Sequence, residues 1–303
     1  MNTGKQLNGV ICINKDEGYT SQDVVSVVRG ILRVKKAGHT GTLDPMARGV
    51  LPVCIGAATK AASFISADRK TYEAVMRLGV TTDTYDMTGN ITGQSGDIPD
   101  EKTVRETVMS FRGELSQRPP LFSAVHINGK RAYELARRGE KADMPVRRVT
   151  VFAIEILSVD LPGLSFSVTC SAGTYIRSLI NDIGQALGCG AAMEALTRTA
   201  CGGFTIDRSC TLGELEKLRD EDRAGEALMP LGDVFAGLKR FELSSAECRI
   251  KAMNGNPLPL PPDLRNGELI FVHDGEGFFY GIYRADAGSG RLMPEKMFLT
   301  EGF

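Results

Sequence analysis

Apolar and polar positions along the chain follow two periodicities, one typical of strands and one typical of helices. The apolar run at residues 9–14 predicts a buried strand, and apolar side chains at helical spacing predict a helix beginning at Thr20 or Ser21. We also expect helices at 58–65, 103–111 and 174–187, the last capped by Thr174, and strands at 71–79, 149–159, 164–170, 268–273 and 277–284. This mixture predicts an α+β fold around an antiparallel or mixed sheet.

Two domains are expected from the length of the chain and from changes in its local composition. The chain has 303 residues, and a proline-rich stretch at 254–262 precedes a β-rich end. We therefore predict a large domain over residues 1–240 and a small one over 241–303. Within the first, residues 119–147 have few apolar runs and many charges, which predicts an excursion from the sheet with a short helix near 132–138.

Composition indicates an ordinary soluble protein, and the N-terminal sequence predicts that it stays in the cytoplasm. Hydrophobic residues make up 42% of the chain and charged residues 24%. The apolar run near the N-terminus is too short for a signal peptide or a membrane span, so we expect no membrane partner. The seven cysteines are scattered without a CxxC pair, which predicts reduced and mostly buried thiols rather than disulfides or structural zinc.

Net charge argues weakly against nucleic acid, whereas local charge does not. The formal net charge is −1. Residues 112–148, however, hold nine Lys or Arg side chains against four acids. Such a cluster is either a solvated face or a surface for RNA phosphates, and charge alone leaves both interpretations open.

The segment 37–52 is dense in Gly, Pro and Thr and predicts a structured loop rather than a regular element. Asp44 lies in it, and Pro45 restricts the backbone of Asp44 to extended geometry. Its carboxylate is a candidate for catalysis, because loops held by a scaffold often carry chemistry. The alternative is an Asx-type turn in which Asp44 only bonds its own backbone.

Common catalytic motifs are missing from the sequence. There is no Walker A sequence, no complete dinucleotide-binding glycine motif and no GxSxG elbow. The three histidines are too far apart for a HExxH pair. These absences disfavour metal-dependent hydrolysis, acyl transfer and a metabolic enzyme that uses a nucleotide cofactor.

Six segments, in order, resemble the bacterial tRNA pseudouridine-55 synthases of the TruB type. They are residues 9–15 (GVICINK), 39–52 (HTGTLDPMARGVLP), 70–72 (KTY), 82–86 (TDTYD), 118–124 (RPPLFSA) and 170–177 (CSAGTYIR). The resemblance extends over most of the chain. It implies a pseudouridine synthase fold for residues 1–240, an RNA-gripping insertion at 119–147 and a PUA-like β-barrel at 241–303.

The resemblance also implies the catalytic residues and a reaction without cofactor or metal. Asp44 matches the catalytic nucleophile, which acts beside C1′ when the glycosidic bond of a uridine is broken and rejoined through C5. Tyr72 matches the aromatic residue that stacks on the flipped base near C5. Arg177 matches the arginine that pairs with the catalytic aspartate.

Further positions are implied to contact the RNA. His39 resembles the histidine that enters the T loop, and the others line the site or grip the RNA through the insertion. They are Lys15, Asp86, Tyr175, Leu196, Arg131, Arg137, Arg138 and Lys141. The expected partner is the T-arm stem-loop of tRNA, with no protein partner and a monomeric enzyme.

Two departures from the family pattern and two rival functions remain. Family members commonly carry lysine where this chain has His126 and Ala172, so we expect altered RNA affinity rather than lost chemistry. One rival is a synthase of the guide-RNA type. The other is an RNA-binding or tRNA-folding protein whose isomerase activity is secondary or lost, which would keep its function without the Asp44 carboxylate.

Overall fold

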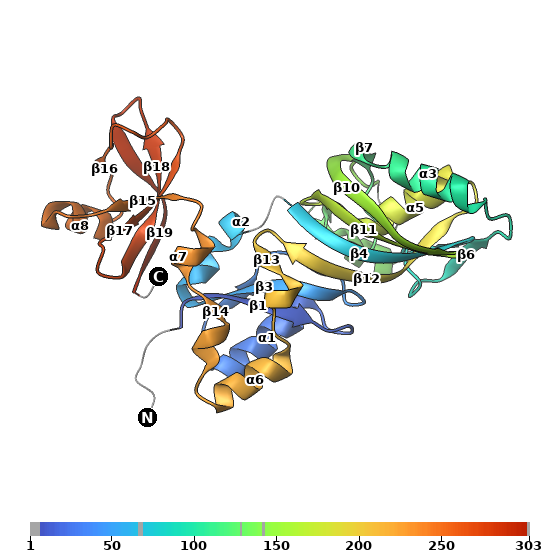
Figure 1. Cartoon of the computed structure of the whole chain (residues 1–303), viewed down its shortest axis with the longest axis horizontal. Coiled ribbons are helices and arrows are strands. Elements are labelled where there is room, and N and C mark those ends of the chain that lie inside the picture. The colour runs from blue at the N-terminus through green and yellow to red at the C-terminus, as the bar shows by residue number, and fades with distance from the viewer. Residues whose placement is uncertain (1–6, 66–68, 128, 141–142, 302–303) are drawn as a thin grey trace. The chain divides into compact units, whose positions relative to one another are not determined.

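The computed structural model describes residues 7–65, 69–127, 129–140 and 143–301 (Figure 1). The chain forms two compact units. The first takes its described residues from 1–45, 50–66 and 203–303, and the second from 46–49 and 67–202. The chain therefore passes between the units more than once.

In the first unit, a small sheet is covered by helices α1 (Ser21–Leu32) and α6 (Leu212–Asp220). Its strands are β14 (Leu228–Met229), β1 (Gly9–Lys15), β3 (Arg48–Ile55) and β2 (Ala37–His39), in that order. Strand β2 runs antiparallel to β3. Figure 1 shows the two helices side by side against this sheet, and apolar side chains of α1, α6, β1 and β3 share one buried cluster. Thr20 begins α1 with a capping box that it forms with Asp23.

The end of the chain forms a second sheet in the same unit. Its order is β15 (Lys239–Glu242), β17 (Leu269–His273), β18 (Phe278–Asp286), β19 (Arg291–Glu301) and β16 (Leu258–Pro259). Phe271 and Phe279 stack at 3.9 Å between ring centroids, and Phe235 packs against both. The curled five-stranded sheet is consistent with the predicted PUA-like fold.

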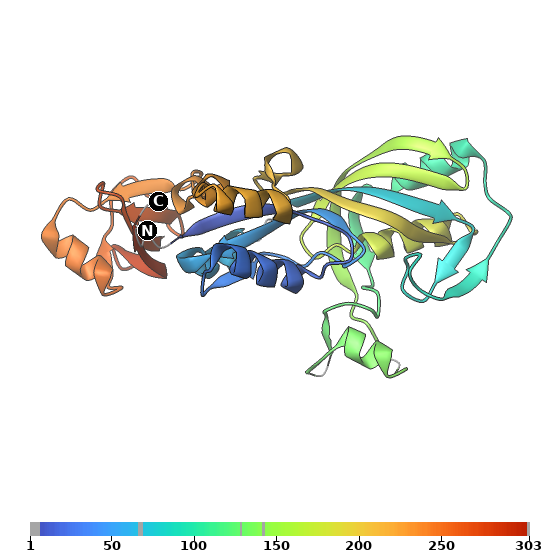
Figure 2. The same cartoon turned by 90° about the horizontal axis from the view of Figure 1, so that it is seen from below.

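The second unit is built on a twisted antiparallel sheet. Its order is β12 (Ala191–Cys201), β4 (Arg69–Leu78), β11 (Gly163–Ser171), β10 (Arg147–Asp160) and β7 (Gly113–Gln117). Helices α5 (Ile176–Ala186) and α3 (Glu101–Ser110) pack on it. Figure 2 shows the insertion, in green, extending away from this sheet, with its short helix α4 (Ala132–Arg137).

The remaining elements are short. They are the 3-10 helices η1 (Gly56–Ala61), η2 (Ile206–Arg208) and η3 (Ala224–Ala227), the helices α2 (Ala62–Ile65), α7 (Leu231–Val234) and α8 (Ala246–Met253), and the strands β5 (Val80–Thr82), β6 (Ile91–Gln94), β8 (His126–Ile127), β9 (Lys130–Arg131) and β13 (Phe204–Thr205).

The predicted α+β class with a mixed sheet is confirmed, whereas two local predictions are wrong and some strands were missed. Residues 37–52 are not one loop, because β2 and the start of β3 flank a shorter loop at 40–47. The longest strands that were not predicted are β12 and β19. Thr174 does not cap α5: Tyr175 is the N-cap residue, and the Thr174 hydroxyl donates instead to the Ser171 carbonyl at 2.9 Å.

Candidate active site

Asp44 lies in a loop that is anchored on both sides. Before it, the buried Ser21 hydroxyl donates to the Leu43 carbonyl at 3.1 Å and accepts from the Leu43 amide at 2.9 Å. After it, the Pro45 carbonyl accepts from the Gly18 amide at 2.9 Å. Asp44 itself is partly exposed. The loop therefore holds this carboxylate at a defined place while leaving it open to solvent.

Lys15 fastens the same loop from the end of β1. Its side chain is fully buried, and its ammonium donates to the carbonyls of Asp16 and Tyr19 at 2.8 Å and of Pro45 at 3.1 Å. Three carbonyl acceptors satisfy the three N–H donors of an ammonium group. This geometry gives Lys15 a structural role beneath Asp44, and its predicted contact with substrate stays a prediction.

His39 ends strand β2, five residues before Asp44. Its backbone pairs with Val53 of β3, and the next amide, that of Thr40, donates to the Pro52 carbonyl at 3.1 Å. The residue as a whole is partly exposed. The first unit thus carries His39, Lys15 and Asp44 together around one loop.

Tyr72 lies on β4 in the second unit, on the face that carries the core. Its cross-strand partners are Val168 of β11 and Arg198 of β12. Burial raises the pKa of Tyr72 to about 12, although the charge of Arg198 and its hydrogen bond to Tyr72 act in the opposite direction. Tyr72 is therefore a neutral phenol near pH 7.

Arg198 was missed by the sequence analysis because strand β12 was missed. Its side chain is fully buried. Lys70 lies two residues before Tyr72, and its pKa is lowered, first by burial and then by the charge of Arg198. No clear sequence signal marked this position, because arginine is seldom buried and the first three residues of β12 show no alternation of buried and exposed side chains.

Arg177 lies in the first turn of α5, where the sequence analysis placed it. Its guanidinium forms a buried ion pair with Asp86 at 3.3 Å and also donates to the carbonyls of Thr84 at 3.2 Å and Phe122 at 3.0 Å. Asp86 in turn accepts from the Thr84 hydroxyl at 2.8 Å and the Thr88 amide at 3.1 Å. The polar loop between β5 and β6 thus fixes the arginine. Asp44 belongs to the other unit, and its pairing with Arg177 stays a prediction.

Tyr175 and Leu196 also lie in the second unit. The backbone of Tyr175 exchanges two hydrogen bonds with the buried Gln117 amide, at 2.8 and 3.1 Å. Leu196 is buried on β12, opposite Ala74 of β4. The Gln117 contact fixes the entry into α5, and Arg177 follows two residues later.

The insertion has its own small core of Val125, Ala132 and Met144. Arg131 and Arg138 are exposed on it, and Arg138 lies 4.0 Å from Glu140. The side chain of Arg137 and the whole of Lys141 lie outside the described residues. The two departures from the family pattern, His126 and Ala172, are both exposed.

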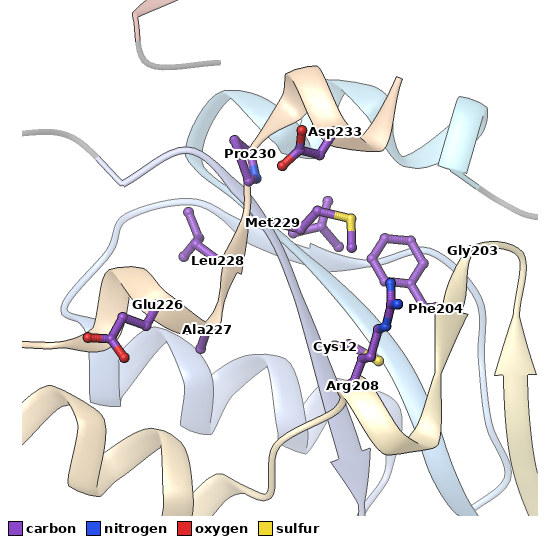
Figure 3. Close-up of a pocket in the computed structure, with 11 residues that line it drawn as sticks. Cys12, Gly203, Phe204, Arg208, Glu226, Ala227, Leu228, Met229, Pro230 and Asp233 are labelled. Atoms are coloured by element: carbon purple, nitrogen blue, oxygen red, sulfur yellow. The ribbon is translucent and has the colours of Figure 1, made fainter. Parts of the chain in front are cut away.

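A separate pocket of about 260 Å³ lies within the first unit (Figure 3). Its lining comes from β1, β13, η2, η3, β14 and α7, and its charged members are Arg208, Glu226 and Asp233. None of the predicted site residues lines it. With both signs of charge in its lining, it offers no preference for an anionic ligand.

No group of three or more His, Cys, Asp or Glu side chains in the described ranges has a metal-binding arrangement. Within the same residues, no helix combines the length and apolar character needed to cross a membrane. Five of the seven cysteines are buried, as predicted.

Comparison with known proteins decides the family. Residues 29–176 match the TruB family pseudouridylate synthase N-terminal domain, and residues 177–235 match the tRNA pseudouridylate synthase B C-terminal domain. A tRNA pseudouridine synthase B of Clostridium kluyveri is 49% identical over 69% of this chain and 73% of its own, and one of Burkholderia pseudomallei is 38% identical over 98% of both. The chain belongs to the TruB family.

A solved structure extends the likeness to the fold of this TruB family member. A chain from an H/ACA RNP bound to a substrate RNA containing 2′-deoxyuridine superposes with a TM-score of 0.72 and is 26% identical, over 96% of this chain and 85% of that one. The pseudouridine synthase fold predicted from the six motifs is thereby confirmed. Identity is higher to the two tRNA pseudouridine synthase B relatives, at 49% and 38%, than to this H/ACA RNP chain, at 26%.

Proposed function

We propose that this TruB family member, a tRNA pseudouridine synthase, isomerises the T-loop uridine at position 55 with Asp44 as its catalytic nucleophile. The observation that carries the proposal is the anchored loop around Asp44. Ser21 fixes the residue before it, and Lys15 and Gly18 fix the residue after it, while Asp44 stays partly exposed. A preorganised carboxylate is what a reaction at C1′ needs.

The reaction exchanges one bond for another within the uridine. The bond between C1′ and N1 breaks, the uracil turns and C5 bonds to C1′. The C5 proton then leaves to solvent through an intermediate acceptor, and N1 takes up a proton. The Asp44 carboxylate either attacks C1′ or stabilises the positive charge that develops on the sugar, so no cofactor is required. Both routes place the carboxylate beside C1′.

Tyr72 enters this reaction as a phenol, because its pKa is raised to about 12. We infer that its ring stacks on the uracil and that its hydroxyl lies near C5, where the proton leaves. Arg177, fixed by Asp86 and two carbonyls, is inferred to hold the Asp44 carboxylate ionised and oriented.

The RNA contacts proposed beyond the catalytic residues form two groups. His39, Lys15, Asp86, Tyr175 and Leu196 would surround the flipped nucleotide, which must leave its stack before it can react. Arg131, Arg137, Arg138 and Lys141 of the insertion would contact phosphates of the T-arm stem-loop. We propose a monomeric, cytoplasmic enzyme with a catalytic domain at 1–240 and a PUA-like domain at 241–303.

The test measures tritium released from C5-labelled uridine in unmodified tRNA. We expect release by the native enzyme and none by Asp44→Asn, with RNA affinity of the variant retained. Asp16→Asn removes an exposed carboxylate near the same loop and should keep full activity. Release by Asp44→Asn at the native rate would refute the role of Asp44. No release by a native enzyme that binds tRNA would favour the tRNA-folding function instead.

A further inference from the structure

A basic segment, residues 29–36, comprises the end of helix α1 and the chain that leads from it to strand β2. It contains Arg29, Arg33, Lys35 and Lys36, and all four side chains are exposed. No Asp or Glu occurs from residue 29 to residue 43. The segment is a dense local positive charge in a chain whose net charge is −1.

Helix stability explains only part of this charge. Arg29 lies in the last turn of α1, and Arg33 is its C-cap residue, with φ of 53°. Cations at the C-terminal end of a helix are stabilised by the helix dipole. Lys35 and Lys36 lie beyond the cap, outside the range of that effect, so the helix gives no reason for them.

Ion pairing within the protein does not explain the two lysines either. In the part of the chain that the structure describes, neither Lys35 nor Lys36 forms an ion pair. The basic region around the predicted insertion differs: Arg118, just before the insertion, pairs with Asp143 at 2.9 Å, and Arg138 within it lies 4.0 Å from Glu140. The two lysines thus keep their full charge available to a ligand.

Strand β2 connects these lysines to the candidate active site. The Lys36 carbonyl accepts from the Gly56 amide at 2.9 Å, and the register then continues to His39 opposite Val53. His39 is three residues after Lys36 along extended chain, which corresponds to roughly 10 Å. A lysine side chain spans much of that distance, so phosphates next to a nucleotide held at His39 lie within its reach.

We propose that Lys35 and Lys36, with Arg33 beside them, bind phosphodiester groups of the RNA strand that carries the target uridine. This inference rests on the proposed function, since it takes RNA as the substrate. The lysines bind the backbone without reading sequence, because an ammonium group recognises a phosphate as a point charge. They fix the strand close to the His39–Asp44 loop.

The test compares the salt dependence of RNA binding. Dissociation constants for a T-arm stem-loop transcript are measured between about 50 and 200 mM KCl for the native protein and for Lys35→Gln/Lys36→Gln. Each lost phosphate contact lowers the slope of log K against log salt by about 0.7 to 0.9, so we expect a decrease of about 1.4 to 1.8. Lys35→Arg/Lys36→Arg should restore the native slope.

Lys217→Gln/Lys296→Gln is the matched control, because it removes the same charge from two exposed positions of the same unit. A native slope in Lys35→Gln/Lys36→Gln, or an equal decrease in the control, overturns the inference. Thermal unfolding of each variant checks that the fold is kept. Tritium release by the native protein is read separately, so failure of the proposed function is distinguishable from failure of this surface.

Discussion

Among single residues, Arg198 is the side chain that bears most directly on Tyr72. It is fully buried and lies across the strand pair from Tyr72. We expect Arg198→Met to lower the free energy of unfolding by about 1 to 3 kcal/mol, because the Tyr72 hydroxyl would stay buried without its donor. Tyr72 would also lose its orientation, so kcat should fall more than KM rises. Urea denaturation and steady-state kinetics check the two effects.

Tyr72→Phe provides the control for that prediction through a double-mutant cycle. If Arg198 acts on the Tyr72 hydroxyl, the two substitutions should be non-additive by roughly 0.5 to 3 kcal/mol. Additive losses of stability would show that Arg198 supports the core independently of Tyr72.

The ion pair between Arg177 and Asp86 gives a second prediction at this scale. Side-chain exposure is 6% and 5%, respectively, so removing one charge leaves the other buried without its counterion. We expect Asp86→Asn to destabilise the protein by about 3 to 5 kcal/mol and to abolish most activity, because Arg177 would no longer be fixed. Chemical denaturation at neutral pH and tritium release measure this.

Asp83→Asn is its control, since Asp83 lies in the same loop but is exposed. That substitution should change stability by less than about 1 kcal/mol. Equal losses for Asp83→Asn and Asp86→Asn would mean that the loop conformation, rather than the buried charge, holds Arg177.

At the scale of elements, the sequence predicted those that have strong periodicity and clear caps. Helix α1 was found because five apolar residues repeat at helical spacing behind Thr20, and β4 because its buried positions alternate. Strand β12 was not found. Its residues Ala191–Met193 are all buried, so no alternation marks them, and a bulge between Met193 and Ala195 shifts the register.

For the site, too, features set by residues close together in sequence could be predicted, whereas contacts between residues far apart in sequence could not. The Asp44 loop was recognisable from glycines and a proline close together in sequence. Arg198 was not, because its neighbour Tyr72 is distant in sequence and is brought close only by the pairing of β12 with β4. The ion pair of Arg177 with Asp86 likewise joins segments 91 residues apart.

Gly49 tests a close backbone contact within the second unit, to which residues 46–49 and strand β12 both belong. Its φ is 102°, and a Cβ there would lie 2.2 Å from the Arg198 carbonyl oxygen. We expect Gly49→Ala to destabilise the protein by about 2 kcal/mol or more, from backbone strain and overpacking. Gly30→Ala, in open space on α1, should instead stabilise by about 0.5 to 1 kcal/mol. Thermal unfolding compares them, and equal shifts would contradict the close contact at Gly49.

At the scale of the whole molecule, charge is distributed unevenly in spite of a net charge of −1. Residues 29–36 carry four cations and no acid, whereas residues 241–303 carry six Lys or Arg side chains against nine acids. RNA affinity governed by phosphate contacts should therefore depend on the few local basic surfaces and only weakly on the C-terminal sheet.

The double substitution Arg265→Gln/Arg291→Gln tests whether the C-terminal sheet contributes to RNA affinity. It removes two exposed cations, one from strand β19 and one from the loop before β17. We expect the dissociation constant to change by less than about twofold for the T-arm stem-loop and for full-length tRNA, since neighbouring acids already offset these charges. Binding of both RNAs is measured at one salt concentration. If affinity is lost only for full-length tRNA, the C-terminal sheet contacts tRNA outside the T arm. The local basic surfaces would then account for only part of the affinity.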